Sequence, residues 1–263
     1  MKKEHADQIL VARKLVPSRE KARALIMAGR VYSAGEKVGK PGQLIDPGAD
    51  VAIAEAPRFI GRGGLKLEEA LDAFHISVAG RTAADLGAST GGFTDCLLKR
   101  GARRVYAVDV DVKQIDCRLR EDARVILIKK NARYLRKKDF AEPLDMVTMD
   151  LSFISVLKVL PAVKEFLARG DLVALLKPQF EAVKGRVGIR GVIRDPEAHQ
   201  DILERVLGAG ERLGFFLHGL VKCSTRGQKG NREFFALWRL DGEPMGPEAM
   251  KAFIRERAHE EKG

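Results

Sequence analysis

Short apolar runs alternate with longer amphipathic stretches along the chain from about residue 61 onward. The runs end at residues 85–87, 105–109, 125–128, 146–150 and 172–177. This alternation is typical of parallel strands that are joined by crossover helices. It predicts an α/β domain over residues 61–242.

Two further apolar runs, Phe215–Cys223 and Glu233–Leu240, follow a helix that is expected to begin near Pro196. Because the polar turn 224–231 joins them, they are expected to form an antiparallel hairpin at the end of an otherwise parallel sheet. That arrangement is typical of the Rossmann-like methyltransferases. Residues 243–263 are mixed in charge, and we expect a C-terminal tail with a terminal helix.

The pattern over residues 1–55 predicts a small α+β domain. A first short helix is expected before Pro17, and a second begins after the N-cap Ser18 and ends at Gly29. The apolar positions are Leu10, Val11, Leu15 and Val16 in the first helix and Ala22, Leu25 and Ile26 in the second. Strand, turn and strand are expected over 31–38, and another strand near 50–53. Residues 56–60 are expected to be a short, partly stiff linker.

The net charge of the chain indicates which classes of partner it can bind. The 263 residues include 47 Lys and Arg against 36 acids, which gives a net charge of +11 and a pI of about 9.7. Such an excess favours polyanions, and nucleic acid is a commoner partner than a membrane surface. Many basic proteins bind neither, so charge alone does not decide the class.

Cysteine usage and hydropathy indicate a cytoplasmic protein. Cys96, Cys117 and Cys223 form no CxxC pair, and such a scattered odd set is typical of reduced thiols rather than of disulfides or a zinc site. The N-terminus lacks the apolar core of a signal peptide, and no run approaches the ~18 apolar residues that span a bilayer. We therefore expect no membrane association and no metal.

Six cations crowd the two predicted N-terminal helices: Arg13, Lys14, Arg19, Lys21, Arg23 and Arg30. A solvated helix face would explain such a charge run by itself. The string from Leu15 to Val31, however, resembles the S4-like RNA-binding domain of ribosomal proteins and RNA-modifying enzymes. The resemblance implies that these two helices face RNA.

A glycine-rich loop follows the first strand of the large domain and leads into a helix. Its glycines let the backbone approach a ligand closely, and Asp109 ends the second strand, where a carboxylate can accept ribose hydroxyl protons. NAD would need G-x-G-x-x-G, but Ala88 and Ser89 follow Gly87, so the second glycine is missing. S-adenosylmethionine, which has no phosphates, fits better, although NAD and a ligand-free turn stay open. The expected cofactor-binding residues are Asp85, Gly87, Ala88, Ser89, Thr90, Gly91, Gly92, Phe93, Asp109 and Asn131.

Four ionisable residues come from separate elements. Lys66 lies on the helix before the first strand, Asp150 and Lys177 end the fourth and fifth strands, and Glu233 begins the last strand. Each alone would more often be structural. Because the two central strands are expected to be neighbours, their end residues should converge above the ligand site.

The same four residues, Lys66, Asp150, Lys177 and Glu233, lie where a ribose 2′-O-methyltransferase keeps its catalytic tetrad. A ribose 2′-OH is a poor nucleophile, and a lysine can stabilise the developing alkoxide or act as the base. We expect Lys177 in that role, with Asp150 orienting it and complementing the sulfonium charge. Lys66 and Glu233 would position the hydroxyl and the ammonium. The methyl transfer is then in line and needs no metal.

From about Asp7 to Trp238 the chain resembles the TlyA (haemolysin A-like) family, an S4-like domain fused to an FtsJ-like methyltransferase. The strings that carry the resemblance are 62–67 (RGGLKL), 87–94 (GASTGGFT), 150–155 (DLSFIS), 177–181 (KPQFE) and 230–234 (GNREF). The resemblance implies S-adenosylmethionine-dependent 2′-O-methylation of cytidine in ribosomal RNA. Ribosomal RNA or ribosomal subunits are therefore the expected partners, and we expect a monomer.

Two more basic segments lie near the predicted site. Residues 129–138 form the first, and Lys184, Arg186, Arg190 and Arg194 form the second, which follows Lys177 and is expected to contact RNA. Two other functions are alternatives: a ribosome-associated RNA-binding protein with an inactive methyltransferase domain, and a membrane-lytic haemolysin. The complete tetrad argues against the first. The second finds no spanning segment or strongly amphipathic helix to support it.

Overall fold

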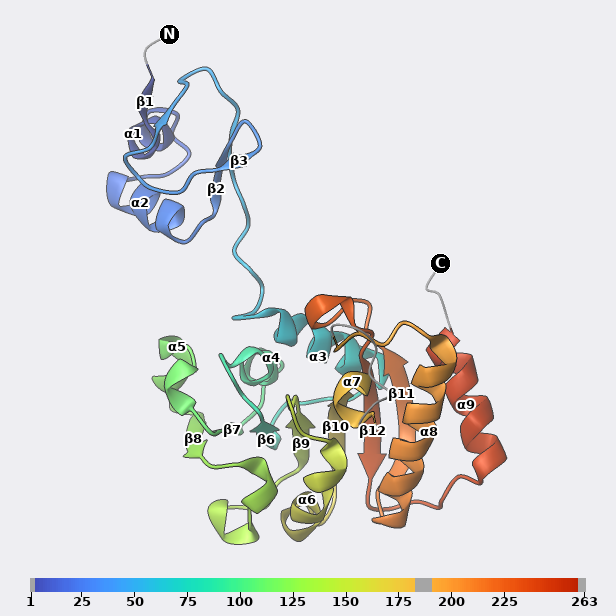
Figure 1. Cartoon of the computed structure of the whole chain (residues 1–263). Coiled ribbons are helices and arrows are strands. Elements are labelled where there is room, and N and C mark those ends of the chain that lie inside the picture. The colour runs from blue at the N-terminus through green and yellow to red at the C-terminus, as the bar shows by residue number, and fades with distance from the viewer. Residues whose placement is uncertain (1–2, 183–190, 260–263) are drawn as a thin grey trace. The chain divides into compact units, whose positions relative to one another are not determined.

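The computed structural model describes residues 3–182 and 191–259. The chain divides into two compact units, Met1–Arg58 and Phe59–Gly263 (Figure 1). Each unit has its own hydrophobic core. The two are therefore described separately.

The N-terminal unit packs two helices against short strands. Its elements are β1 (Glu4–His5), α1 (Ala6–Ala12), α2 (Arg19–Met27), β2 (Val31–Ser33), β3 (Glu36–Lys37), β4 (Leu44–Ile45) and β5 (Val51–Ile53). The antiparallel sheet has the order β3-β2-β5, and β1 pairs with β4. Ser18 caps α2 by accepting a hydrogen bond from the Lys21 backbone N–H at 3.2 Å, and Gly29 has the positive φ of +67° that ends a helix. Both helix-boundary predictions are thus confirmed.

The first helix is shorter than the apolar pattern suggested. Leu15 and Val16 lie beyond the end of α1, because Lys14 adopts a left-handed φ of 58° and turns the chain back. The backbone N–H of Leu15 then donates to the carbonyl of Leu10 at 3.0 Å. Val16 is still buried, whereas Leu15 is 42% exposed, so two apolar residues in one run have different environments.

The large unit contains a seven-stranded sheet with the order β11-β12-β10-β9-β6-β7-β8. Its strands are β6 (Thr82–Leu86), β7 (Arg104–Asp109), β8 (Val125–Lys129), β9 (Met146–Met149), β10 (Asp171–Leu176), β11 (Phe216–Lys222) and β12 (Phe234–Arg239). The predicted hairpin is confirmed, but the last strand does not lie at the edge. It inserts between β10 and β11 and runs antiparallel to both, so β11 is the edge strand.

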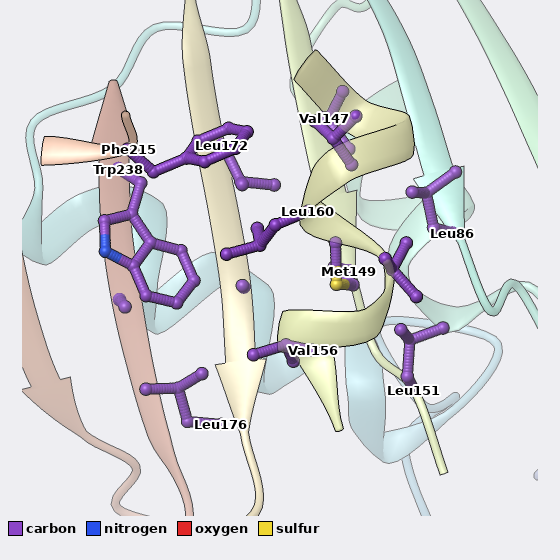
Figure 2. Packing of buried hydrophobic residues seen from close by; sticks show 14 of the residues in the cluster. Leu86, Val147, Met149, Leu151, Val156, Leu160, Leu172, Leu176, Phe215 and Trp238 are labelled. Carbon is purple, nitrogen blue, oxygen red and sulfur yellow. The ribbon is translucent and has the colours of Figure 1, made fainter. Parts of the chain in front are cut away.

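Helices cover both faces of this sheet. They are α3 (Arg62–Ala73), α4 (Gly92–Lys99), α5 (Cys117–Arg120), α6 (Leu160–Phe166), α7 (Pro178–Glu181), α8 (Pro196–Arg212) and α9 (Pro247–His259). Short 3-10 turns are η1 (Val112–Gln114), η2 (Ala132–Tyr134), η3 (Lys137–Asp139), η4 (Val156–Lys158) and η6 (Gln228–Gly230). Along β10, Leu172 and Ala174 pack with α6, α8 and α9, while Val173 and Leu175 pack with α3 and α4. This period of two places one core on each face of the sheet. Figure 2 shows the first of these cores, which includes Leu172.

Helix α9 belongs to the first of these cores. Its side chains Met250 and Ile254 are 4% and 0% exposed. The segment expected as a tail therefore packs with the rest of the unit over its described residues. No helix within residues 3–182 and 191–259 is long and apolar enough to span a membrane.

Candidate functional site

The order of the strands reverses between β6 and β9, and a cavity opens where these strands end. It has a volume of about 270 Å³. Apart from Gly61, its lining residues come from the five strings singled out in the sequence: Gly61, Arg62, Gly63, Lys66, Gly87, Ala88, Ser89, Thr90, Gly92, Phe93, Asp150, Ser152, Lys177, Gln179, Phe180 and Glu233. We call it the central cavity.

Two ion pairs lie side by side in the central cavity. Lys66 Nζ, from α3, is 2.6 Å from Glu233 Oε2, which directly precedes β12. Lys177 Nζ, directly after β10, is 2.6 Å from Asp150 Oδ1, directly after β9. The lysine side chains are 11% and 13% exposed, so both pairs can still meet a ligand in the cavity. The four residues predicted as a tetrad therefore line one cavity.

Lys66 is positioned by the close packing of two helix starts. Helix α3 begins four residues before Lys66, and a Cβ at Gly64 would lie 2.5 Å from Phe59 Cβ and 2.9 Å from the Gly92 carbonyl oxygen. Because glycine has no Cβ, the first turn of α3 can approach the start of α4. This approach brings Lys66 over the edge of the sheet.

The same helix also holds the loop 224–231. The carboxylate of Glu69, one turn after Lys66, accepts hydrogen bonds from the Ser224 backbone N–H at 3.1 Å and from Ser224 Oγ at 2.7 Å. At the other end of the loop, Glu233 pairs with Lys66. Sequence reasoning missed Glu69, since nothing in its local pattern distinguishes it from a solvent-facing acid.

The glycine-rich loop makes direct backbone contact with Asp150. Gly87 has a φ of +86°, and a Cβ there would lie 2.4 Å from the Asp150 carbonyl oxygen. Ser89 donates its backbone N–H to Asp109 Oδ2 at 2.9 Å, so the loop is also tied to the end of β7. Gly91, with a φ of +99°, is the N-cap of α4. The backbone of the loop therefore faces the cavity and is fixed by its contacts with Asp150 on one side and Asp109 on the other.

A second cavity of about 640 Å³ adjoins the first. The two share Gly87, Ser89, Asp150 and Ser152. The second is lined in addition by Asp109 and by Asn131, which were expected to bind the cofactor. Together the cavities can hold an elongated ligand that lies across the glycine-rich loop, with one end in each cavity.

Asp85 lies elsewhere than the other expected cofactor residues. It is fully buried beneath the loop and lines neither cavity, and its carboxylate accepts hydrogen bonds from Thr94 Oγ1 at 2.7 Å and Thr148 Oγ1 at 3.2 Å. Burial raises its pKa to about 7, and the nearby Asp150 charge adds to this, while the hydroxyl contacts oppose it. Asp85 joins β6, β9 and α4 under the site.

An aromatic pair stands at the rim. Phe153, in the string after Asp150, is 87% exposed with a φ of 65°, and its ring centroid lies 5.1 Å from that of Phe180. A bulky residue with positive φ is uncommon and often marks a functional position. Beneath this pair, buried Glu181 accepts hydrogen bonds from Ser155 Oγ at 2.5 Å and from the Val156 backbone N–H at 2.8 Å. Sequence reasoning used these residues as family markers and missed their contacts.

The six basic residues that were predicted to face RNA are exposed except for half-buried Arg30. Arg19 and Arg23 donate to buried Asp7 at 2.8 and 3.0 Å, but their side chains stay 51% and 57% exposed. Arg13 and Arg30 donate to backbone carbonyls within the unit. Four of the six therefore also stabilise the fold. Lys184, Arg186 and Arg190 lie outside the described residues.

Replacing Gly87 by Ala is expected to lower the free energy of unfolding by about 1–3 kcal/mol, because the new Cβ overlaps the Asp150 carbonyl and positive φ disfavours alanine. Gly80→Ala is the matched control, since Gly80 has a similar φ of +75° but no atom within 4 Å of the place where its Cβ would lie. Urea unfolding of both variants measures the difference. Equal destabilisation would show that the close approach to Asp150 has no energetic weight.

The two units match two known families. Residues 59–240 match the FtsJ-like methyltransferase family, and residues 6–51 match the S4 domain. A relative from Mycobacterium tuberculosis, 16S/23S rRNA (cytidine-2′-O)-methyltransferase TlyA, is 42% identical over 88% of this chain and 88% of its own length. Hemolysin A of Brachyspira hyodysenteriae is 39% identical over 83% of this chain and 92% of its own length. The resemblance inferred from the five strings is confirmed.

Solved structures of similar proteins agree with these family matches. A chain described as "Putative hemolysin from Streptococcus thermophilus" has a TM-score of 0.74 and 40% identity, over 98% of this chain and 96% of that one. A chain described as "putative S-adenosylmethionine dependent methyltransferase from Listeria monocytogenes" has a TM-score of 0.51 and 13% identity, over 69% of this chain and 100% of that one. At that identity the likeness concerns the fold alone. The expected fold class is confirmed.

Proposed function

Since the chain belongs to the FtsJ-like methyltransferase family and carries an S4 domain before the catalytic unit, we propose that it methylates a ribose 2′-OH, that of a cytidine, in ribosomal RNA. The observation that carries this proposal is the pair of ion pairs in the central cavity, Lys66–Glu233 and Lys177–Asp150, each 2.6 Å long. The S4 domain and the names of the relatives support RNA as the substrate.

The residues around the two cavities fit S-adenosylmethionine. Asp109 would hold the ribose hydroxyls in the second cavity, where Asn131 also lies. The amino-acid end would extend over Gly87 into the central cavity, because no side chain of that glycine intervenes. Asp85 lies beneath the glycine-rich loop and stabilises it through its hydrogen bonds, without facing the ligand. When bound, the cofactor supplies the methyl group, which leaves its sulfonium sulfur for the ribose oxygen.

The tetrad would then act on the acceptor. Lys177 Nζ, which is held by Asp150 and donates to Ser152 Oγ at 3.1 Å, would contact the 2′ oxygen and stabilise the negative charge as the hydroxyl proton is released to water. Lys66 and Glu233 would orient the hydroxyl, because their ion pair lines the same cavity as Lys177. Most of the acceleration would come from holding the two reactants in line.

The exposed ring of Phe153 is suited to stack on the base of the target nucleotide, since enzymes that modify RNA often splay a base onto an aromatic side chain. Phe153→Ala is expected to raise the KM for RNA about tenfold or more, as one stacked base contributes about 1–3 kcal/mol. Phe153→Tyr, which keeps a ring, should restore the wild-type KM. Equal RNA affinity in all three proteins would exclude a stacking role.

Transfer of a labelled methyl group from S-adenosylmethionine to purified ribosomal subunits and to naked ribosomal RNA tests the proposal. We expect label on the ribose of one cytidine. The phosphodiester bond next to it should then resist alkaline hydrolysis, because the 2′ oxygen is methylated. Label on a base would contradict the ribose assignment. Cofactor binding without label on any RNA would instead favour the inactive, RNA-binding alternative.

A further inference from the structure

A cleft with no lining residue in common with the central cavity lies at the edge strand of the sheet. Its volume is about 410 Å³, and it is lined by the end of β11, the loop before β12 and one residue of α9. Figure 1 shows these elements at the side of the sheet away from β8. The cleft and the central cavity are linked by adjacent residues, because Arg232 lines the cleft and the next residue, Glu233, lines the central cavity.

Cations from each of these elements meet in the cleft. Lys222 ends β11, Arg226 and Arg232 belong to the loop, and Arg257 comes from α9. Among the described residues that line it, none is acidic. A cleft with this lining attracts anions, because its positive charges are not balanced by a carboxylate on the described residues that line it.

Two of these guanidinium groups are held in place at the rim. Arg257 lies 4.1 Å over the Phe253 ring and donates to Glu256 at 2.8 Å, and its side chain is still 34% exposed. Arg226 donates to the Gly230 carbonyl at 3.4 Å, within its own loop, and is exposed. Ordered guanidinium groups suit phosphate oxygens, because their donors lie in a planar fork.

The floor of the cleft differs from its rim. Leu220 and Cys223 are 2% and 8% exposed, and Val221 lies half-buried between them. An apolar floor beneath a cationic rim matches one nucleotide, whose base is flat and poorly hydrated and whose phosphate is charged. A lone inorganic anion would use the rim but not the floor.

We propose that this cleft binds a nucleotide of the RNA strand next to the one that is methylated, with the base on the apolar floor and the phosphate among Arg226, Arg232 and Arg257. The inference rests on the proposed function, because it takes RNA as the substrate. It adds a second contact point beside the central cavity, which would fix the register of the strand relative to Lys177.

The test neutralises two rim cations in the full chain, Arg226→Gln with Arg257→Gln. The matched control is Lys251→Gln with Arg255→Gln, which removes the same charge at two positions of α9 that do not line the cleft. Affinity for purified ribosomal RNA is measured by filter binding at several salt concentrations, together with kcat and KM. Arg257→Glu is a second variant, in case the double variant is unstable on thermal unfolding.

We expect the cleft variants to bind RNA at least about tenfold more weakly than the control, with a salt slope smaller by about 0.7 for each phosphate that they no longer neutralise. Affinity and slope equal to those of the control would overturn the proposal, as would binding of inorganic phosphate at the cleft with RNA affinity unchanged. Weaker RNA binding by the cleft variants, in a protein whose wild type methylates no ribose, would support the cleft while overturning the proposed reaction.

Discussion

Lys177→Met is expected to reduce kcat for methyl transfer about 10³-fold while leaving S-adenosylmethionine bound. Lys177 Nζ lies 2.6 Å from Asp150 and lines the central cavity, so methionine removes the cation that would face the 2′ oxygen but keeps a similar volume. Removing one donor that stabilises a developing oxyanion typically costs about 10²–10³ in rate. Single-turnover methyl transfer and calorimetric titration of the cofactor measure the two effects separately.

The matched control for this variant is Lys99→Met. Lys99 pairs with Asp95 at 2.9 Å on α4 and lines neither cavity. The Lys99→Met variant should therefore transfer methyl groups at the wild-type rate. A rate for Lys177→Met within tenfold of this control would contradict the catalytic role, and loss of cofactor binding would place the lysine in the donor site instead.

Asp85→Asn is expected to flatten the dependence of stability on pH. Burial raises the pKa of Asp85 to about 7, so between its unfolded value near 3.8 and pH 7 the folded chain binds more protons than the unfolded chain. Stability from this group is complete below pH 3.8 and is lost as the pH rises through 7. At about 1.4 kcal/mol for each pKa unit, the wild type should lose at most about 4 kcal/mol relative to the variant.

Urea unfolding of both proteins at pH 4, 5, 6, 7 and 8 gives the difference, and other titrating groups cancel because they are common to the two. Asparagine can still accept a hydrogen bond from Thr94 or Thr148, so the fold around β6 should persist. Parallel pH profiles would mean that Asp85 has an ordinary pKa in the folded protein.

Local patterns predicted much of the fold. The alternation of short apolar runs with longer amphipathic stretches indicated parallel strands joined by crossover helices, and the close spacing of the last two runs indicated a hairpin. The same patterns failed where a single residue decides. Lys14 turns left-handed and ends α1 early, and β1 and β4, of two residues each, are too short to show any period.

The candidate site was partly readable in the same way. Asp150 and Lys177 follow neighbouring strands, so the topology alone predicts their approach. The expected placement of Asp85 among ligand-facing residues did not anticipate its burial, because side chains in a strand alternate between faces and its position at the strand end did not say which face. Exposed Phe153 could not be told from a core residue by its type.

The sequence by itself determined the types of element, their order, and the residues that we propose for the chemistry, because these follow from periodicity and short motifs. Tertiary structure alone decided which of them meet. Lys66 and Glu233 are 167 positions apart and pair since Gly64 lets α3 pack on α4. The cationic cleft likewise forms because β12 inserts inside the sheet and leaves β11 beside α9 at its edge. Such contacts depend on how whole helices and strands pack, which no local pattern of residues encodes.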